Sequence, residues 1–214
     1  MRTITVKGVG NIFARADSIE IDINFETTDT DYEKLGLTIA KKVKAIYKTI
    51  IDLGYKKEDI KTTNFKLFCR HRYPGKALQD HQREFDCFVC SHSLKLSFDF
   101  DSKRLAAVIS ALGGCGVKLD LDIHFTLKNP MKVHEELLIS ATQNATAKAT
   151  ILCQAAGTQL GQLLSINYDW NELDIISQTN FDIGKRFQFN CPAPEIEPED
   201  IAVSDCATFV WEIL

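Results

Sequence analysis

Two acidic pairs have the residue type and spacing that could do chemistry. Glu20 with Asp22, and Asp120 with Asp122, are each separated by one residue within runs that alternate apolar and polar side chains. Residues two apart on a strand share a face, so each pair could bind a divalent cation or act in acid–base catalysis. His124 follows the second pair at the same spacing and could complete a metal site. The alternative, which we favour, is the polar outer surface that any one-sided sheet needs.

A second candidate is the C-x-x-C pattern of Cys87 and Cys90, among seven cysteines in the chain. The pattern could indicate a redox pair or half of a zinc site. However, residues 85–100 look like a strand, where side chains three apart point to opposite faces. A redox pair normally opens a helix, and a zinc site needs a second ligand pair that the sequence does not offer. We therefore expect reduced, packed thiols, with a functional thiol as the alternative.

The remaining motifs are weak. Four further histidines are isolated in the sequence and are expected to be structural or solvated: His71, His81, His92 and His134. Gly8 and Gly10 form a G-x-G, but no third glycine or following helix completes a dinucleotide fingerprint, so we interpret them as a turn or bulge. No G-x-S-x-G, P-loop or H-E-x-x-H pattern is present. We therefore predict no catalytic residue, no metal ligand and no cofactor.

A long helix over residues 129–157 organises the elements around these runs. Asn129 is a suitable N-cap, Pro130 suits the first helical position, and Gly157 can take the left-handed conformation that ends a helix. Apolar residues at three- and four-residue steps predict one buried stripe: Leu137, Leu138, Ala141, Ala145, Ala149, Leu152 and Ala156. Because the stripe is rich in alanine, the helix should lie close to a sheet.

The other elements are a second long helix, a shorter helix and a set of strands. The second long helix is predicted between the capping box of Thr30 and Glu33 and the stop at Gly54, and the shorter one begins at Ser102. Alternation of apolar and polar residues predicts the strands, at about 3–7, 19–26, 63–70, 85–100, 119–127, 164–170 and from about 201 to 214.

The composition narrows the class of protein. The chain has 214 residues, of which 45% are hydrophobic and 25% charged, with a net charge of −4. These values are typical of a globular domain and argue against a nucleic-acid partner. No apolar run approaches the roughly 20 residues of a transmembrane helix. Residues 1–17 alternate like a strand rather than forming a secretory signal, so we expect a cytoplasmic location.

Residues 171–197 form an irregular segment that is too long for an ordinary connection. The segment contains Phe181, Phe187 and Phe189. We interpret it as an excursion that either covers the core or docks on a neighbouring copy. It is therefore the candidate contact segment of a homo-oligomer.

Several runs, in this order along the chain, resemble the SIMPL-domain family. They are ITVKGVG with Ala16 and Asp17 after it, KEDIKTTNFKL, CSHSLKLSFDFDS, the long helix with Lys148, and the final PEDIAVSDCATFVWEI. The resemblance covers nearly all of residues 1–214, and the serial order carries it. It implies an α+β fold with long helices packed on antiparallel sheet, and a tendency to form higher oligomers. Bacterial members are often labelled oxidative-stress-defence or periplasmic immunogenic proteins, and the family has no established catalytic residues.

Together these observations predict one α+β domain over residues 1–214, with a largely antiparallel sheet, two long helices and one shorter helix. Two lobes are expected, residues 1–60 with 118–214 and residues 61–117. The expected function is a non-enzymatic oligomeric scaffold or binding protein, which the family labels link to stress response. The alternative is a metal- or thiol-dependent enzyme or redox sensor that uses an acidic strand face or a reactive cysteine.

Overall fold

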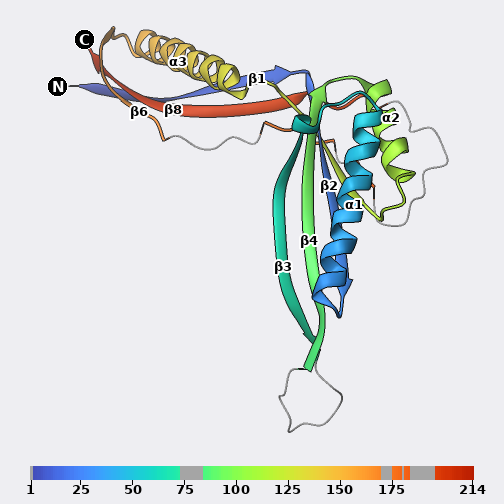
Figure 1. The fold of residues 1–214 in the computed structure, drawn as a ribbon. Coiled ribbons are helices and arrows are strands. Elements are labelled where there is room, and N and C mark those ends of the chain that lie inside the picture. Colours follow the sequence, from blue (N-terminus) through green and yellow to red (C-terminus); the bar gives the residue numbers. More distant parts are fainter. Residues whose placement is uncertain (1, 73–83, 170–174, 180, 184–195) are drawn as a thin grey trace. The chain divides into compact units, whose positions relative to one another are not determined.

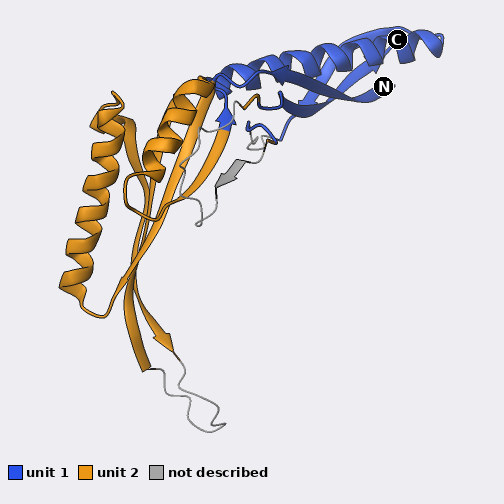
Figure 2. Ribbon diagram, turned by 90° about the vertical axis from the view of Figure 1, so that its right-hand side faces the viewer, with its two compact units in different colours: residues 1–17, 125–178, 198–214 blue, residues 18–124, 179–197 orange. Residues whose placement is uncertain are grey.

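The computed structural model describes residues 2–72, 84–169, 175–179, 181–183 and 196–214. Its helices and strands are shown in Figure 1. The chain divides into two compact units, which Figure 2 colours separately: unit 1 is residues 1–17, 125–178 and 198–214, and unit 2 is residues 18–124 and 179–197. Each unit contains an antiparallel sheet and at least one helix, which confirms the predicted α+β class.

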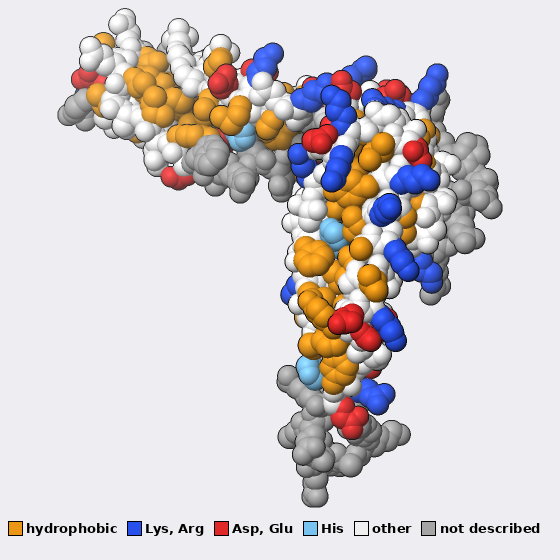
Figure 3. All heavy atoms as spheres, in the orientation of Figure 1, with side chains coloured by type: hydrophobic (Ala, Val, Ile, Leu, Met, Phe, Trp, Pro, Cys, Tyr) orange, Lys and Arg blue, Asp and Glu red, His pale blue; other side chains and the backbone are white. Residues whose placement is uncertain are grey.

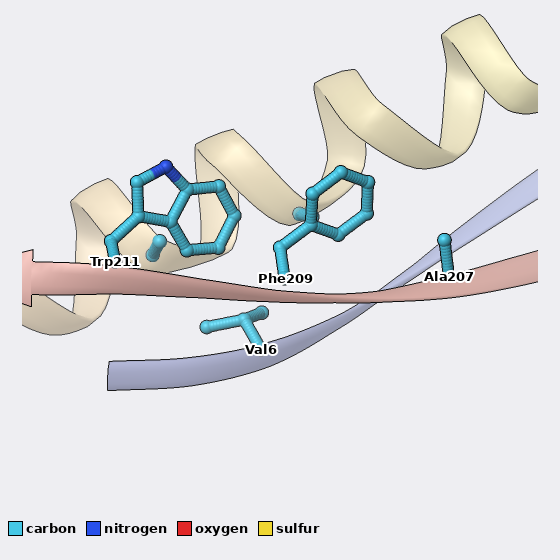
Figure 4. Close-up of a cluster of buried hydrophobic side chains, with 6 residues drawn as sticks. Val6, Ala207, Phe209 and Trp211 are labelled. Carbon is cyan, nitrogen blue, oxygen red and sulfur yellow. The ribbon is translucent and has the colours of Figure 1, made fainter. Parts of the chain in front are cut away.

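Unit 1 is a three-stranded sheet, in the order β1-β8-β6, with the helix α3 packed on one face. Its elements are β1 (Thr3–Ala14), α3 (Pro130–Ala155), β6 (Leu160–Asn167) and β8 (Ile201–Ile213). β1 and β8 pair without a break from Thr3↔Glu212 to Ala14↔Ile201. Alternate side chains of β8 point to α3, and Figure 4 shows Phe209 and Trp211 among them.

The two glycines of β1 set the distance between this sheet and α3. A Cβ on Gly8 would collide with the carbonyl oxygen of Ala141 and lie 2.8 Å from the Cβ of Ala145. A Cβ on Gly10 would collide with the carbonyl oxygen of Leu137. The interpretation of the G-x-G as a turn or bulge is therefore wrong. Both glycines lie inside a regular strand, where the lack of a side chain lets the helix backbone approach.

The long helix begins and ends as predicted, but its buried stripe is narrower. The side chain of Asn129 accepts from the N–H of Lys132, and Gly157 has a φ of +70°. The buried residues recur strictly every fourth position: Val133, Leu137, Ala141, Ala145, Ala149 and Cys153. Leu152 is 52% exposed, and Leu138 and Ala156 are also outside the stripe. A helix held this close to a sheet can bury only one row of side chains.

Unit 2 is a five-stranded sheet in the order β3-β4-β2-β5-β7. Its elements are β2 (Ser18–Asp29), α1 (Tyr32–Asp52), the short 3-10 helix η1 (Lys57–Asp59), β3 (Ile60–Arg72), β4 (Glu84–Asp99), α2 (Ser102–Gly113), β5 (Asp120–Thr126) and β7 (Phe181–Ile183). α1 packs on β2 and β4, and α2 packs beside α1. Alternate residues of β2 and β4 that are at most 8% exposed form the core under the helices: Ile19, Ile21, Ile23, Phe25, Leu94, Leu96 and Phe98.

The structure groups β2 and α1 with β3 and β4, so the division of the chain does not follow the expected lobes 1–60 with 118–214 and 61–117.

The N-caps of α1 and α2 also differ from the predicted residues, Thr30 and Ser102. The side chain of Asp31 caps α1 by accepting from the N–H groups of Glu33 and Lys34, and Asp101 caps α2 in the same way. A carboxylate one residue from the predicted cap forms these bonds instead, since Asp is as good an N-cap as Ser or Thr.

The described parts of residues 171–197 lie on their own chain. Ile175 is buried against α3 and β8 in unit 1, and the hydroxyl of Ser177 donates to the carbonyl of Glu199 at 2.6 Å. Phe181–Ile183 pair with Leu121–Ile123 at the edge of the unit 2 sheet. Phe187 and Phe189 lie outside the described residues. Over the part of the chain that is described, no helix is long and apolar enough to cross a membrane.

Candidate functional site

The structure brings the predicted acidic residues together on the face of the unit 2 sheet opposite the helices. β2 and β5 are neighbours, so Asp22 and Asp122 come from adjacent strands. His124 Nε2 lies 3.5 Å from Asp22 Oδ2, and the amide of Asn24 donates to Asp122 Oδ2 at 3.0 Å. Glu20 accepts from Lys95 of β4 at 2.7 Å. These residues lie on the polar outer face of the sheet, and Glu20, Asp22 and Asp122 each contact a side chain of a neighbouring strand.

The partners of these acids determine what the cluster can do. The hydrogen bond that Lys95 donates to Glu20 raises the pKa of the Lys95 ammonium, which favours its charged form. Among the described residues, no group of three or more His, Cys, Asp or Glu side chains is arranged to hold a metal ion. Asp120 is partly buried and lies two residues before Asp122 on β5. It does not form a three-ligand group with Asp22 and His124. The bonds of Glu20, Asp22 and Asp122 therefore link neighbouring strands of the sheet.

The cysteine pair is divided between the two faces of β4. Cys90 is fully buried and packs against Leu35 and Ile39 of α1, and burial raises the pKa of its thiol. Cys87 is paired across the strands with Arg70, and partial burial together with Asp86 raises the pKa of its thiol. A raised pKa lowers the thiolate fraction at neutral pH, and the thiolate is the reactive form. Neither thiol has the depressed pKa that a redox sensor uses.

His92 of β4 is a buried ionisable side chain that sequence reasoning placed among the structural or solvated histidines. It is 7% exposed and lies between the rings of Phe25, at 5.1 Å, and Phe65, at 5.2 Å. Neither ring nitrogen has a hydrogen-bond partner within the described part of the chain. Burial lowers the pKa of His92, so the folded protein holds it neutral.

This burial predicts an acid-sensitive fold. Below about pH 6.5 the unfolded chain binds a proton at His92 that the folded chain excludes, so the free energy of unfolding falls as pH falls through that value. For one proton the slope cannot exceed about 1.4 kcal/mol per pH unit. We expect His92→Leu to remove this part of the pH dependence in urea unfolding between pH 7.5 and 5. The exposed His71→Leu should leave the slope as it is, and equal slopes in all three proteins would contradict the assignment.

A different kind of surface lies on the hairpin of β3 and β4. Only Ile60 of the thirteen residues of β3 is buried. Phe65 is 57% exposed, Phe68 is 39% exposed and Phe85 of β4 is 45% exposed. Figure 3 shows hydrophobic side chains along this hairpin with Lys and Arg beside them. The signal was present in the sequence, because IKTTNFKLFCRHR does not alternate cleanly as a half-buried strand would.

The outer face of α3 is a second exposed apolar surface. Met131, Ile139 and Ile151 are 62%, 58% and 63% exposed and lie on one row of four-residue steps, opposite the buried stripe. Beside them the hydroxyls of Thr142, Thr146 and Thr150 donate to backbone carbonyls one turn earlier. Between Leu137 and Ala156 the only charged residue is Lys148. We call this row with its threonines the α3 outer face.

Two side chains of α3 seal the free edge of β1. Asn144 Oδ1 accepts from the N–H of Val9 at 3.1 Å, and Lys148 Nζ donates to the carbonyl of Lys7 at 3.4 Å. These backbone groups point away from β8, where a further strand would otherwise add. The contact gives Lys148, one of the residues that carry the resemblance, a structural role.

Comparison with known proteins identifies the family and gives no activity. The model of the SIMPL family, described as a protein of unknown function (DUF541), matches residues 4–211. No curated protein matches the chain. The match spans both units, from Ile4 of β1 to Trp211 of β8, and it includes the glycines of β1 and the whole of α3. The chain therefore belongs to the SIMPL family.

Proposed function

We propose that this protein is a non-enzymatic scaffold that self-associates through the α3 outer face. The observation that carries the proposal is that α3 exposes Ile139 and Ile151 to solvent on a stretch, Leu137 to Ala156, whose only charged residue is Lys148. A surface helix normally presents charged and polar side chains opposite its buried stripe. A contiguous exposed apolar patch on a protein commonly marks an interface.

The geometry of the row suits helix-to-helix packing. Ile139, Gln143, Ala147 and Ile151 share a ridge at four-residue spacing. Such ridges pack into the grooves of another helix. The threonine hydroxyls already have acceptors in their own helix, so burying them against a second copy leaves no hydroxyl unsatisfied. Mainly methyl groups would then be removed from water, which is favourable by about 25 cal/mol per Å² of apolar surface.

The enzyme alternative receives no specific support from the geometry. The acids of the unit 2 sheet are held by cross-strand partners, and the pKa values of Cys87 and Cys90 are raised. We therefore propose the scaffold role alone.

The test is the mass in solution of the protein and of two matched double variants. By sedimentation velocity at about 100 µM we expect the protein to run as a multiple of its 24.1 kDa chain. Ile139→Glu with Ile151→Glu should reduce it to a monomer of unchanged circular dichroism, because burying two carboxylates in an apolar interface is unfavourable.

Leu37→Glu with Ile51→Glu is the control, since these α1 residues are 65% and 44% exposed. This control should retain the mass of the unaltered protein. A monomeric unaltered protein, or an α3 variant that keeps its full mass, would refute self-association through this face.

A further inference from the structure

Among the described strands, β3 is a long strand at the edge of the unit 2 sheet. It pairs with β4 on one side, and no other described strand lies on its other side. In contrast, the outer edge of β1 is capped by Asn144 and Lys148. An unpaired edge of this length is a ready template for strand addition unless it is blunted.

The pairing of β3 with β4 shows which part of the edge is regular. The register shifts between Thr62 and Asn64 and again between Arg70 and His71. Asn64–Arg70 is therefore an uninterrupted run of seven residues, about 23 Å long at 3.3 Å per residue. At the first shift the extra residue is Thr63 of β3 itself, which disturbs the edge there, and at the second it is Asp86 of β4. We therefore consider strand addition along the regular run between them.

The two faces of this run differ in chemistry. Phe65 and Leu67 lie on the same face as His92 and Cys90, which is the face that α1 covers further along the sheet. Lys66, Phe68 and Arg70 lie on the opposite face. Across β3 there is no acidic residue, whereas four cations are present: Lys61, Lys66, Arg70 and Arg72.

We propose that the Asn64–Arg70 edge binds an extended peptide segment of a partner protein in which acidic and apolar residues alternate. Side chains directly opposite on adjacent strands share a face and interact. Apolar side chains of the partner would lie beside Phe65 and Leu67, and acidic ones beside Lys66. Arg70 already pairs with Glu26 at 2.7 Å, whereas Lys66 lies over the Phe68 ring at 5.6 Å and has no acidic partner in the described residues.

Charge and geometry favour an acidic peptide over two other occupants of this edge, a second copy of β3 and a single-stranded nucleic acid. A second copy of β3 has no carboxylate to offer to Lys66. Single-stranded nucleic acid is bound by aromatic rings that stack successive bases along one basic groove. Here Phe65 and Phe68 are on opposite faces of the strand, so they cannot form one stacking platform.

The experiment uses a fluorescein-labelled nine-residue peptide that alternates glutamate and valine, added to the full chain, with anisotropy as the readout. We expect saturable binding that weakens with salt. N-methylation of alternate peptide nitrogens should weaken it at least tenfold, because strand addition uses the peptide N–H groups. Lys66→Glu should weaken binding about tenfold. Lys103→Glu, on an exposed turn of α2, is the control: it makes the same change in net charge away from β3 and should alter the affinity by less than twofold.

Other outcomes would overturn the proposal. They are no binding, equal binding of the N-methylated peptide or of a lysine–valine peptide, and tighter binding of an oligothymidine that competes with the peptide. A loss of solution mass in Lys66→Glu would show instead that β3 pairs with a second copy. The inference goes beyond the proposed self-association, and the monomeric α3 variant separates the two, because it should still bind the peptide.

Discussion

Gly10→Ala is expected to destabilise unit 1 by about 3 kcal/mol, the upper end of the usual cost of overpacking. The added methyl group would sit 3.0 Å from the carbonyl carbon of Leu137 and 3.1 Å from the amide nitrogen of Ala141. These are backbone atoms, so no rotamer change can make room and the helix itself must move away. Gly8→Ala should behave in the same way, because its methyl group would meet the backbone of Ala141.

Two measurements check this expectation. Urea unfolding gives the loss of free energy, and hydrogen exchange locates it, with reduced protection expected in β1, β8 and α3 and not in β2 or β4. Gly36→Ala is the matched control, because a Cβ there meets nothing within 4 Å on the exposed side of α1. Replacing a glycine inside a helix should stabilise by about 0.5–1 kcal/mol. If Gly36→Ala and Gly10→Ala change the free energy of unfolding by the same amount, the effect of Gly10→Ala comes from chain entropy and not from close packing against α3.

The parts of the fold that depend on local chemistry were predictable from the sequence. Asn129 and Gly157 bound α3 because a cap needs a side-chain oxygen and a helix end needs a positive φ, and both are properties of single residues. Alternation in residues 19–25 correctly predicts the buried face of β2, since Ile19, Ile21 and Ile23 are fully buried.

The parts that depend on distances between elements were not predictable in this way. The same G-x-G fits a turn, a bulge or a close contact, and only the position of α3 shows that Gly8 and Gly10 serve the contact. Leu152 falls at a helical spacing and was assigned to the buried stripe. It is 52% exposed, because only the row from Val133 to Cys153 at every fourth position faces the sheet.

In the candidate site, too, some features follow from single residues and others from the arrangement of the strands. Residue type and spacing correctly place Glu20, Asp22 and Asn24 on one face of β2. They do not show that Lys95 bonds to Glu20 or that Asn24 bonds to Asp122, because those bonds depend on the order of the strands. The open edge of β3 could not be deduced either. Pairing with one neighbour or two is decided by topology, which a strand of 13 residues does not reveal on its own.

Phe209→Ala is expected to cost about 3–5 kcal/mol, the range for removing a buried aromatic ring. Phe209 is 1% exposed and stacks on Trp211 with centroids 5.5 Å apart and an angle of 18° between the planes. Ala145 and Ala149 of α3 belong to the same buried cluster as Phe209, and their side chains are too short to fill the space that the ring would leave. The surroundings therefore cannot collapse, and the cavity cost should fall near the top of the range.

Phe13→Ala is the matched control, since it removes the same ring from a strand of the same sheet where the side chain is 76% exposed. A substitution at such an exposed position should change the free energy of unfolding by no more than about 0.5 kcal/mol. Urea unfolding followed by circular dichroism should therefore separate the two variants by at least about 2.5 kcal/mol. If both lose the same free energy, Phe209 does not anchor α3 to the sheet, and the close contact at Gly8 and Gly10 would have to hold the helix without it.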